Sequence, residues 1–300
     1  MAHITILGLG VGGLTATVPM WVSECTQAHN RGIMVMLSGW FAVGGLVLAT
    51  WLEFGLYFVP NNSVSWRLPI AFQAVFALII VSTVLFMPES PRWLIKMDRV
   101  EEARGILATL DDIPQESQEM AENLAMIQYT LTEEMRLHDS SSPFALTHNR
   151  HLHRTLLAMG VNFFAQMSGI SVITFYSTTI FESDLGYSGT VARIISGSLQ
   201  IWQFCCAGVA VLLIDRLGRR PLLIATASAM CIAQFCLAGL SSDISNHKAG
   251  SATVFFYFFV ETFFPMGFLL VPFMYAAEVA PLRTRAKVTA LSAATNWIFR

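Results

Sequence analysis

Charged residues are scarce in this sequence. Asp, Glu, Lys and Arg together make up 13% of its 300 residues, whereas soluble domains carry about 25%. The formal net charge is only -2, and no basic patch lies outside short loops. The composition argues against an ordinary soluble globule and against a nucleic-acid partner.

Metal-binding and catalytic patterns are also lacking. The five cysteines lie mostly inside apolar runs, without the spacing of a metal site or a disulfide framework, and we interpret them as small buried hydrophobes. His151 and His153 form an isolated HxH pair, which is a weak metal signal. The first apolar stretch lacks the basic segment of a cleavable signal peptide. With no nucleophile–base pair either, we predict no cofactor, no metal and no enzyme activity.

One apparent motif does not fit its context. Gly8, Gly10 and Gly13 form a GxGxxG pattern after a short apolar run, as in dinucleotide-binding folds. That reading requires a strand–helix–strand unit with an acidic residue about twenty positions further on. Here Pro19 interrupts the following segment. We therefore interpret these glycines as small residues that permit close helix packing.

Long hydrophobic runs dominate what is present. Hydrophobic residues make up 54% of the chain, and a membrane-spanning helix needs about twenty consecutive apolar residues. Such runs lie near 4–22, 33–55, 68–87, 155–180, 191–213, 222–241 and 252–276, with a shorter one at 287–300. The sequence predicts an all-α polytopic membrane protein with about seven full transmembrane helices and part of an eighth.

One polar segment separates the third run from the fourth. Residues 89–150 are rich in Glu, Asp, Gln and Ser. Their periodicity predicts two amphipathic helices near 98–110 and 115–137, divided at the Asp111–Pro114 turn. We expect these helices to lie on the membrane domain rather than to cross the bilayer.

The basic residues predict an orientation. Alternating spans place most Lys and Arg residues on one side, which is cytoplasmic by the positive-inside rule. Residues 89–153 are then cytoplasmic, and the first residue lies outside. Fourteen of the eighteen Lys and Arg residues fall on that side: Arg31, Arg92, Lys96, Arg99, Arg104, Arg136, Arg150, Arg154, Arg216, Arg219, Arg220, Arg283, Arg285 and Lys287.

The fourth run is unusually polar for its length. Between Asn162 and Phe181 it contains Gln166, Ser168, Ser171 and Tyr176, and each polar group left unpaired in hydrocarbon costs several kcal/mol. Gly169 follows Ser168, so two small residues soften the helix there. Broken polar helices of this kind line the binding sites of transporters. Packing of a polar face against neighbouring helices is the alternative.

Ordered motifs along the whole chain resemble one family. Pro19, Trp21, Ser23, Glu24, Arg31 and Gly32, then Pro88–Leu94 (PESPRWL), Asp215–Arg220 (DRLGRR) and Glu278–Arg285 (EVAPLRTR) follow one another before Asn296 and Trp297. This pattern resembles the sugar porter family of the major facilitator superfamily, and most of all its fungal hexose and disaccharide transporters.

The resemblance implies a partial major facilitator fold. Residues 1–88 would be the C-terminal half of the N-terminal helix bundle (spans 4–6), 89–153 a cytoplasmic helical linker, and 154–300 an incomplete C-terminal bundle (spans 7–10 and part of 11). Spans 1–3 and 12 would lie outside the sequence, which we expect to be truncated at both ends.

The resemblance also implies a substrate site. A sugar needs uncharged amides and hydroxyls to exchange hydrogen bonds, and aromatic rings to cover its apolar faces. Several family positions are altered, with Ala165 and Ser171 replacing amides, Gly39 replacing Gln, and Leu269–Leu270 replacing a Gly-Pro pair. The residues that correspond to the family's site are Gln166, Ser171, Tyr176, Gln203, Phe268, Phe273, Trp40 and Asn296.

Charged residues at the cytoplasmic ends of the spans match the family's gating network. Opposite charges there would hold the two halves together in one state and separate in the other, and solvated loops with weak pairs are the alternative. The gating residues implied are Glu24, Arg31, Glu89, Arg92, Asp215, Arg219, Arg220, Glu278 and Arg285.

The resemblance implies alternating-access transport of a sugar or related polyhydroxylated solute across the lipid bilayer, expected at the plasma membrane. Coupling to protons is open, because the family's proton-binding acid lies on a span outside the sequence. Glu261 lies inside a span, but not where the family places an acid. A sugar sensor and a truncated relative without transport activity stand as alternatives.

Overall fold

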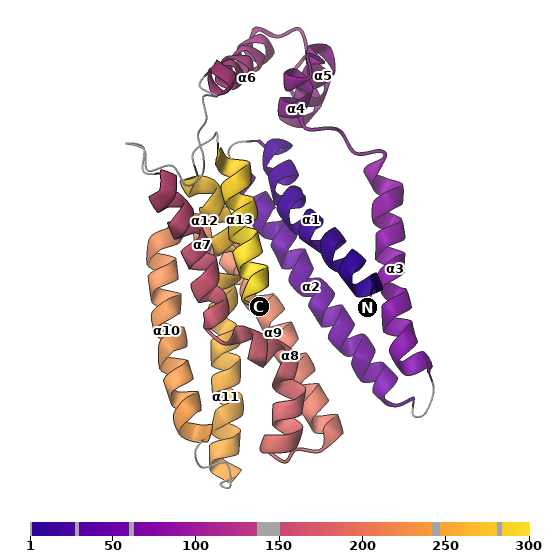
Figure 1. Cartoon of the computed structure of the whole chain (residues 1–300), viewed down its shortest axis with the longest axis vertical. Coiled ribbons are helices and arrows are strands. Elements are labelled where there is room, and N and C mark those ends of the chain that lie inside the picture. Colours follow the sequence, from indigo (N-terminus) through magenta and orange to yellow (C-terminus); the bar gives the residue numbers. More distant parts are fainter. Residues whose placement is uncertain (1, 28–29, 60–62, 137–150, 242–246, 281–283) are drawn as a thin grey trace.

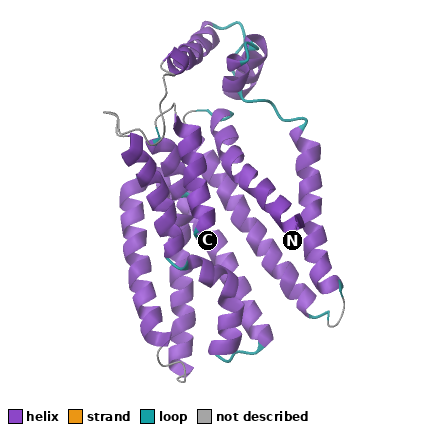
Figure 2. Ribbon diagram, viewed as in Figure 1, coloured by secondary structure: helices purple, strands orange, loops and turns teal. Residues whose placement is uncertain are grey.

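The computed structural model describes residues 2–27, 30–59, 63–136, 151–241, 247–280 and 284–300. Within these ranges the chain is helical and contains no strand (Figure 2). The predicted all-α membrane fold is confirmed, and the eighth apolar run forms only a 14-residue helix. Seven segments are long and apolar enough to span a membrane: Thr5–Glu24, Gly32–Tyr57, Val64–Val84, His151–Asp184, Gly189–Ile214, Arg219–Leu240 and Ala249–Val279.

The helices form two groups, with three further helices at one end (Figure 1). The first group comprises α1 (Ala2–Glu24), α2 (Arg31–Tyr57) and α3 (Val64–Val84). The second comprises α7 (His151–Met167), α8 (Ile170–Thr179), η1 (Ile180–Asp184), α9 (Gly189–Leu217), α10 (Arg219–Leu240), α11 (His247–Phe264), η3 (Pro265–Leu269), α12 (Val271–Val279) and α13 (Arg285–Ile298). The GxGxxG glycines lie within α1, which excludes the strand that a dinucleotide site requires.

The end helices are α4 (Pro91–Lys96), α5 (Val100–Asp111) and α6 (Gln118–Arg136). The last two correspond to the predicted amphipathic helices, whereas α4 was not predicted. Ser90 caps α4 by accepting a hydrogen bond from the Trp93 backbone N–H at 3.3 Å, and Pro91 occupies a first-turn position. A small apolar core of Leu107, Met120 and Leu124 joins α5 to α6.

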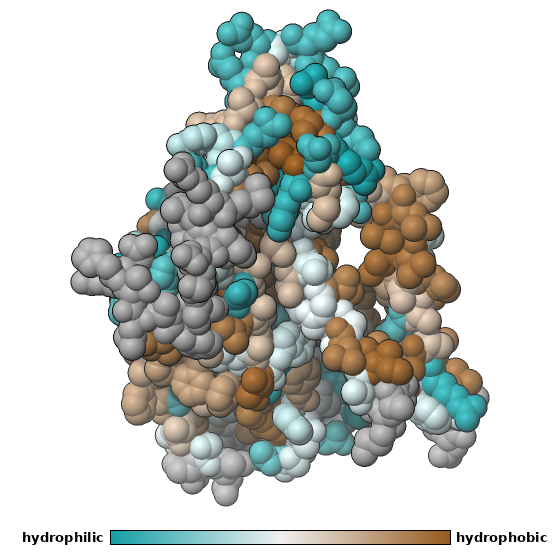
Figure 3. Space-filling view, turned by 45° about the horizontal axis from the view of Figure 1, so that its top comes forward, coloured by the Kyte–Doolittle hydropathy of each residue, from teal (hydrophilic) through white to brown (hydrophobic). Residues whose placement is uncertain are grey.

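Apolar side chains cover much of the outer surface of the spans. Helix α3 has no buried residue, and the side chain of Leu78 on it is 69% exposed. Hydrophilic surface instead gathers over the α4–α6 end (Figure 3). This division suits helices that face lipid, because the apolar lipid chains cover these side chains and keep them out of water.

The two groups meet along α2 and α9. The indole of Trp40 on α2 stacks on Phe204 of α9 with ring centroids 4.8 Å apart, and its Nε1 donates to the Phe204 carbonyl at 2.9 Å. A Cβ added to Gly44 would lie 3.2 Å from the Phe204 ring, and one added to Gly208 would lie 3.3 Å from Trp40. Glycine therefore provides the room that each ring occupies.

Adjacent glycines on α2 test this contact. We expect Gly44→Leu to lower the free energy of unfolding by about 1–3 kcal/mol, because the added side chain overpacks against Phe204. Gly45 faces open space, so Gly45→Leu is the matched control and should change stability little. Thermal unfolding of the purified chain in detergent measures both. Equal effects would mean that the α2–α9 contact does not depend on the missing side chain.

Candidate functional site

The polar span breaks at Gly169. Its backbone φ is +76°, which ends α7 before α8 begins. The break leaves the Ser168 carbonyl outside the regular helical ladder, and the Gln234 side chain on α10 donates to it from Nε2 at 2.9 Å. The softening predicted from Ser168 and Gly169 is thus a complete interruption, with its exposed backbone paired by a side chain.

Two predicted site residues meet across this break. The Ser171 hydroxyl on α8 donates to Gln166 Oε1 on α7 at 3.0 Å, and both side chains are half-buried. Tyr176 is further along α8 and 60% exposed. The break therefore places an amide and a hydroxyl side by side, with an aromatic ring on the same half-helix.

Gln203 lies on α9, beside the residue that stacks on Trp40. Its side chain is 2% exposed, and its Oε1 has no hydrogen-bond partner among the described residues. The Oε1 of Gln200, one turn earlier, is in the same situation. Unpaired buried amide oxygens are costly, so they mark a place where a polar ligand or water gains hydrogen bonds.

Trp40 is engaged in packing. Both its ring face and its Nε1–H are occupied by Phe204. In this arrangement it joins the two helix groups and has no free indole donor.

Two of the altered family positions are in contact. A Cβ added to Gly39 on α2 would lie 1.9 Å from Leu270 Cδ2, between η3 and α12. Leu270 therefore fills the space that a larger residue 39 would need. Phe268 and Phe273, on either side of this leucine, are both half-buried, and Phe268 packs on the apolar core of the second helix group.

Asn296 lies in a buried polar network between α7 and α13. Its Nδ2 donates to Asn162 Oδ1 at 3.0 Å, and Asn162 Nδ2 donates to Ser292 Oγ at 2.7 Å. The Ser292 hydroxyl donates to the Ala158 carbonyl at 2.7 Å. Sequence reasoning did not assign Asn162 a role, although an Asn inside an apolar run was the available signal.

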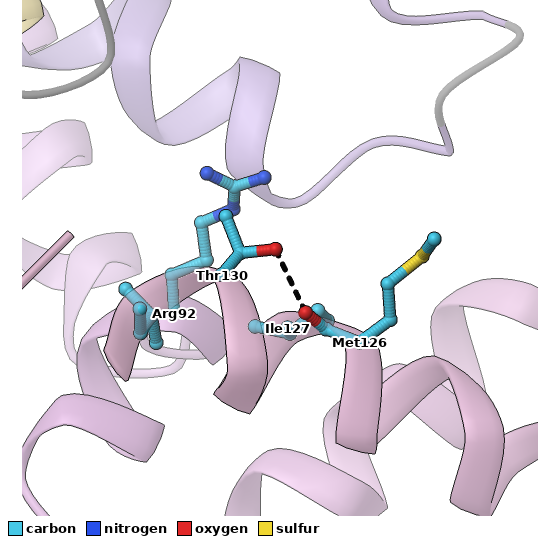
Figure 4. A pocket seen from close by; sticks show the side chains of 5 residues that line it. Arg92, Met126, Ile127 and Thr130 are labelled. Carbon is cyan, nitrogen blue, oxygen red and sulfur yellow. Dashed lines mark hydrogen bonds between the residues drawn. The ribbon is translucent and has the colours of Figure 1, made fainter. Parts of the chain in front are cut away.

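Two pockets lie elsewhere in the molecule. Neither is lined by the residues at the Gly169 break or by the Asn162–Asn296 network. A groove of about 580 Å³ lies between α1 and α13, lined by glycine, alanine and apolar residues that include Gly12, Ala293 and Trp297. A smaller pocket of about 120 Å³ lies between Arg92 on α4 and Ile127 and Thr130 on α6 (Figure 4). Arg92, predicted as a gating charge, thus faces the α6 helix.

Two of the predicted gating residues, Glu24 and Glu89, lie where the end of α1 approaches the start of α4. The Ser90 hydroxyl donates to the Glu24 carboxylate, and Trp21 Nε1 donates to the Pro88 carbonyl at 3.1 Å. Burial raises the pKa of the Cys25 thiol, and the nearby negative charges of Glu24 and Glu89 raise it further. These acids therefore lie close together, on the same side of the protein as α4.

In the second helix group, Arg219 Nη2 lies 3.0 Å from Glu278 Oε1 and links α10 to α12. A partly exposed pair of this kind is worth about 0–1 kcal/mol. Neither this pair nor the Glu24–Ser90 bond, which joins α1 to the start of α4, connects the first helix group to the second. Arg220 is exposed and Arg285 half-buried. The side chains of Arg31 and Asp215 lie outside the described part of the structure.

A cluster at the opposite end does connect the groups. The Arg193 guanidinium on α9 lies over the Tyr57 ring of α2, 3.9 Å from its centroid. Arg193 Nη1 also lies 3.5 Å from Glu182 Oε2 on η1. Sequence reasoning missed this cluster, for which an isolated Arg within an apolar run was the only signal.

The break at Gly169 gives a first test of the site. A β-carbon at positive φ costs about 1–2 kcal/mol, so Gly169→Ala should destabilise the chain or straighten the span. Gly160, a helical glycine of α7 with open space around it, provides the control, and Gly160→Ala should be neutral or stabilising. Thermal unfolding compares them. An unaffected Gly169→Ala variant would contradict the positive-φ break.

The Asn162–Asn296 bond gives a second test. Asn296→Ala leaves Asn162 Oδ1 buried without its donor and should destabilise the chain by about 1–3 kcal/mol. Gln73→Ala removes an exposed amide on α3 and should have little effect. Thermal unfolding in detergent again provides the measurement. Unchanged stability of the Asn296 variant would exclude a packing role for this amide.

Sequence comparisons extend over nearly the whole chain. The sequence model of a family described as "Sugar (and other) transporter" matches residues 4–300. The "Sugar transporter STL1" of Saccharomyces cerevisiae is 35% identical over 296 residues, which cover 98% of this chain and 51% of that protein. The "Hexose transporter 2" of Kluyveromyces lactis is 31% identical, with 98% and 53% covered. The chain thus spans about half the length of the curated relatives it matches.

Solved structures share the fold. One of the "MFS (major facilitator superfamily) proton:xylose symporter XylE bound to 6-bromo-6-deoxy-D-glucose" has a TM-score of 0.79 at 22% identity, covering 94% of this chain and 57% of that one. The partially occluded inward-open form of the xylose transporter XylE from E. coli has a TM-score of 0.75 at 21% identity, covering 97% and 61%. At this identity the likeness establishes the arrangement of helices.

Proposed function

The chain belongs to the sugar (and other) transporter family, and from this premise we propose that it moves a sugar or related polyhydroxylated solute across a membrane by alternating access. The observation that carries the proposal is the broken span at Gly169, which brings Gln166 and Ser171 together. The family is one of transporters rather than enzymes. Its members in Saccharomyces and Kluyveromyces carry transporter names, which favours transport over the sensor alternative.

The chemistry around the break suits an uncharged polyol. Each sugar hydroxyl both donates and accepts a hydrogen bond, and the Gln166 amide and Ser171 hydroxyl can exchange such bonds with it. The unpaired Oε1 atoms of Gln200 and Gln203 on α9 are acceptors for further hydroxyls. Tyr176 on α8, and Phe268 and Phe273 beside Leu270, are aromatic rings that could cover a sugar face.

By the resemblance, the site differs from that of a typical hexose carrier at several positions. Ala165, Ser171 and Gly39 replace amide positions of the family, and Leu270 fills the space beside Gly39. Each lost hydrogen bond is worth about 0.5–1.5 kcal/mol. The class therefore remains a sugar, a disaccharide, a polyol or another polyhydroxylated solute, with no assignment to glucose.

The proposed topology follows from the basic residues and the fold. The α4–α6 helices lie on the cytoplasmic side, where Lys and Arg gather, and the start of α1 lies towards the outside of a plasma membrane. Residues 1–88 and 154–300 then belong to the two halves of the carrier, joined by the linker 89–153, part of which (137–150) lies outside the described residues. The Glu24–Ser90 contact would attach the linker to the first half, and the Arg219–Glu278 contact would stabilise the cytoplasmic end of the second half.

Replacing Gln166 tests the site. Gln166→Ala should raise the apparent KM for the transported solute about two- to tenfold, the effect of one lost hydrogen bond. Gln73→Ala, an exposed amide on α3, is the control and should leave the KM unchanged. Uptake of radiolabelled sugars and polyols by transporter-deficient cells that express the chain provides the measurement. An unchanged KM for Gln166→Ala would make Gln166 a packing residue, and the absence of saturable uptake by the wild type would contradict transport by this chain.

A further inference from the structure

One carboxyl group lies in the apolar interior of the second helix group. Glu261 on α11 is 1% exposed, and neither carboxylate oxygen has a hydrogen-bond partner among the described residues. Its neighbours on the same helix, Val260, Phe264 and Tyr257, belong to the buried apolar cluster that also includes residues of α8, α9 and α10. The group is used by none of the contacts described above.

An ionised carboxylate is unfavourable in such a place. A carboxylate inside a membrane domain is stabilised by a cation or by several hydrogen-bond donors, and among the described residues Glu261 has neither. The titratable group that faces it from α9 is the Cys206 thiol. Among the side chains that the structure describes, the other titratable groups on these packed helices are Cys205 on α9, Cys231 and Cys236 on α10, and Tyr257 on α11. The arginines lie at the ends of α9 and α10: Arg193, Arg216, Arg219 and Arg220. Asp215 near the end of α9, and His247 and Lys248 at the start of α11, have side chains outside the described part of the structure.

A neutral carboxylic acid resolves the difficulty, since a bound proton removes the charge. A metal ion would need several ligands, and no group of three His, Cys, Asp or Glu residues gathers within the described part of the chain. The ligand that fits a single carboxyl here is a proton.

The helix changes form one turn after Glu261. The π-helix η3 begins at Pro265, one turn beyond Glu261, and leads into α12. Within η3, Gly267 packs so closely on α10 that an added Cβ would lie 1.9 Å from Thr226 Oγ1. Interruptions of this kind are frequent at functional sites. Glu261 therefore lies one turn before an irregular segment of the same span, which is packed against α10.

We propose that Glu261 is a proton-binding site, which holds a proton while α11 is packed on α9 and α10 and loses it when the segment around η3 opens to water. On release the proton passes from the carboxyl oxygen to water, leaving a hydrated carboxylate that regains a proton from water before the helices pack again. The proposal that Glu261 binds a proton rests on the burial of its carboxyl group. The use of that proton in coupling rests on the proposed transport function.

Infrared spectroscopy tests proton binding without a transported solute. The chain reconstituted in lipid should show the C=O stretch of a protonated carboxyl at neutral pH, and this band should disappear at alkaline pH. Glu261→Gln should remove the band, Glu261→Asp should shift it, and Glu53→Gln, at an exposed glutamate of α2, should leave it intact. A band that is absent from the wild type, or that survives in Glu261→Gln, would overturn the proposal.

Vesicles with an imposed pH gradient test the release step. An acidic outside should accelerate solute uptake by the wild type and by Glu53→Gln, whereas Glu261→Gln should lose this acceleration. Equal acceleration in Glu261→Gln would overturn the coupling role. If the wild type shows no uptake at all, the transport function fails, and the infrared band still decides whether Glu261 holds a proton.

Discussion

The absence of water inside a bilayer is the constraint on which this structure depends. Each backbone N–H and C=O group must find its partner within the protein, so regular helices fill the described spans and every interruption needs compensation. The break at Gly169 meets this requirement because Gln234 donates to the freed Ser168 carbonyl. The same constraint explains why the break carries polar side chains. A gap in the helical ladder is tolerated where hydrogen-bonding groups line it, and those groups can also bind a solute.

Small residues decide how the two helix groups meet. Along α2 and α9, Gly44 and Gly208 accommodate the rings of Phe204 and Trp40. Leu270 takes the space beside Gly39 in the same manner. Gly39 and Leu270, which are far apart along the chain, are thus neighbours in space. Because interiors are close-packed, a change at position 39 and one at position 270 cannot be understood separately.

The buried and half-buried polar groups described above differ in how they are paired. Asn162, Ser292 and Asn296 satisfy one another and stabilise the contact between α7 and α13. The Gln166–Ser171 pair is half-buried and paired within its own span, so it can exchange partners with a solute. The Gln203 Oε1 and the Glu261 carboxyl are buried without a partner among the described residues, and such groups mark places where a ligand, water or a proton completes the bonding.

The sequence by itself determined the features that depend on neighbouring residues. Apolar runs of sufficient length predicted the seven spans, amphipathic periodicity predicted α5 and α6, and Ser168–Gly169 within a polar run predicted the position of the break. Only the tertiary structure decided which distant groups meet. That Gln234 pairs the break, that Asn296 bonds Asn162 and that Trp40 packs on Phe204 follow from helices that are far apart in the chain. Periodicity shows which face of a helix is apolar, but the identity of the facing helix, and therefore the partner of each buried polar atom, is set by packing in three dimensions.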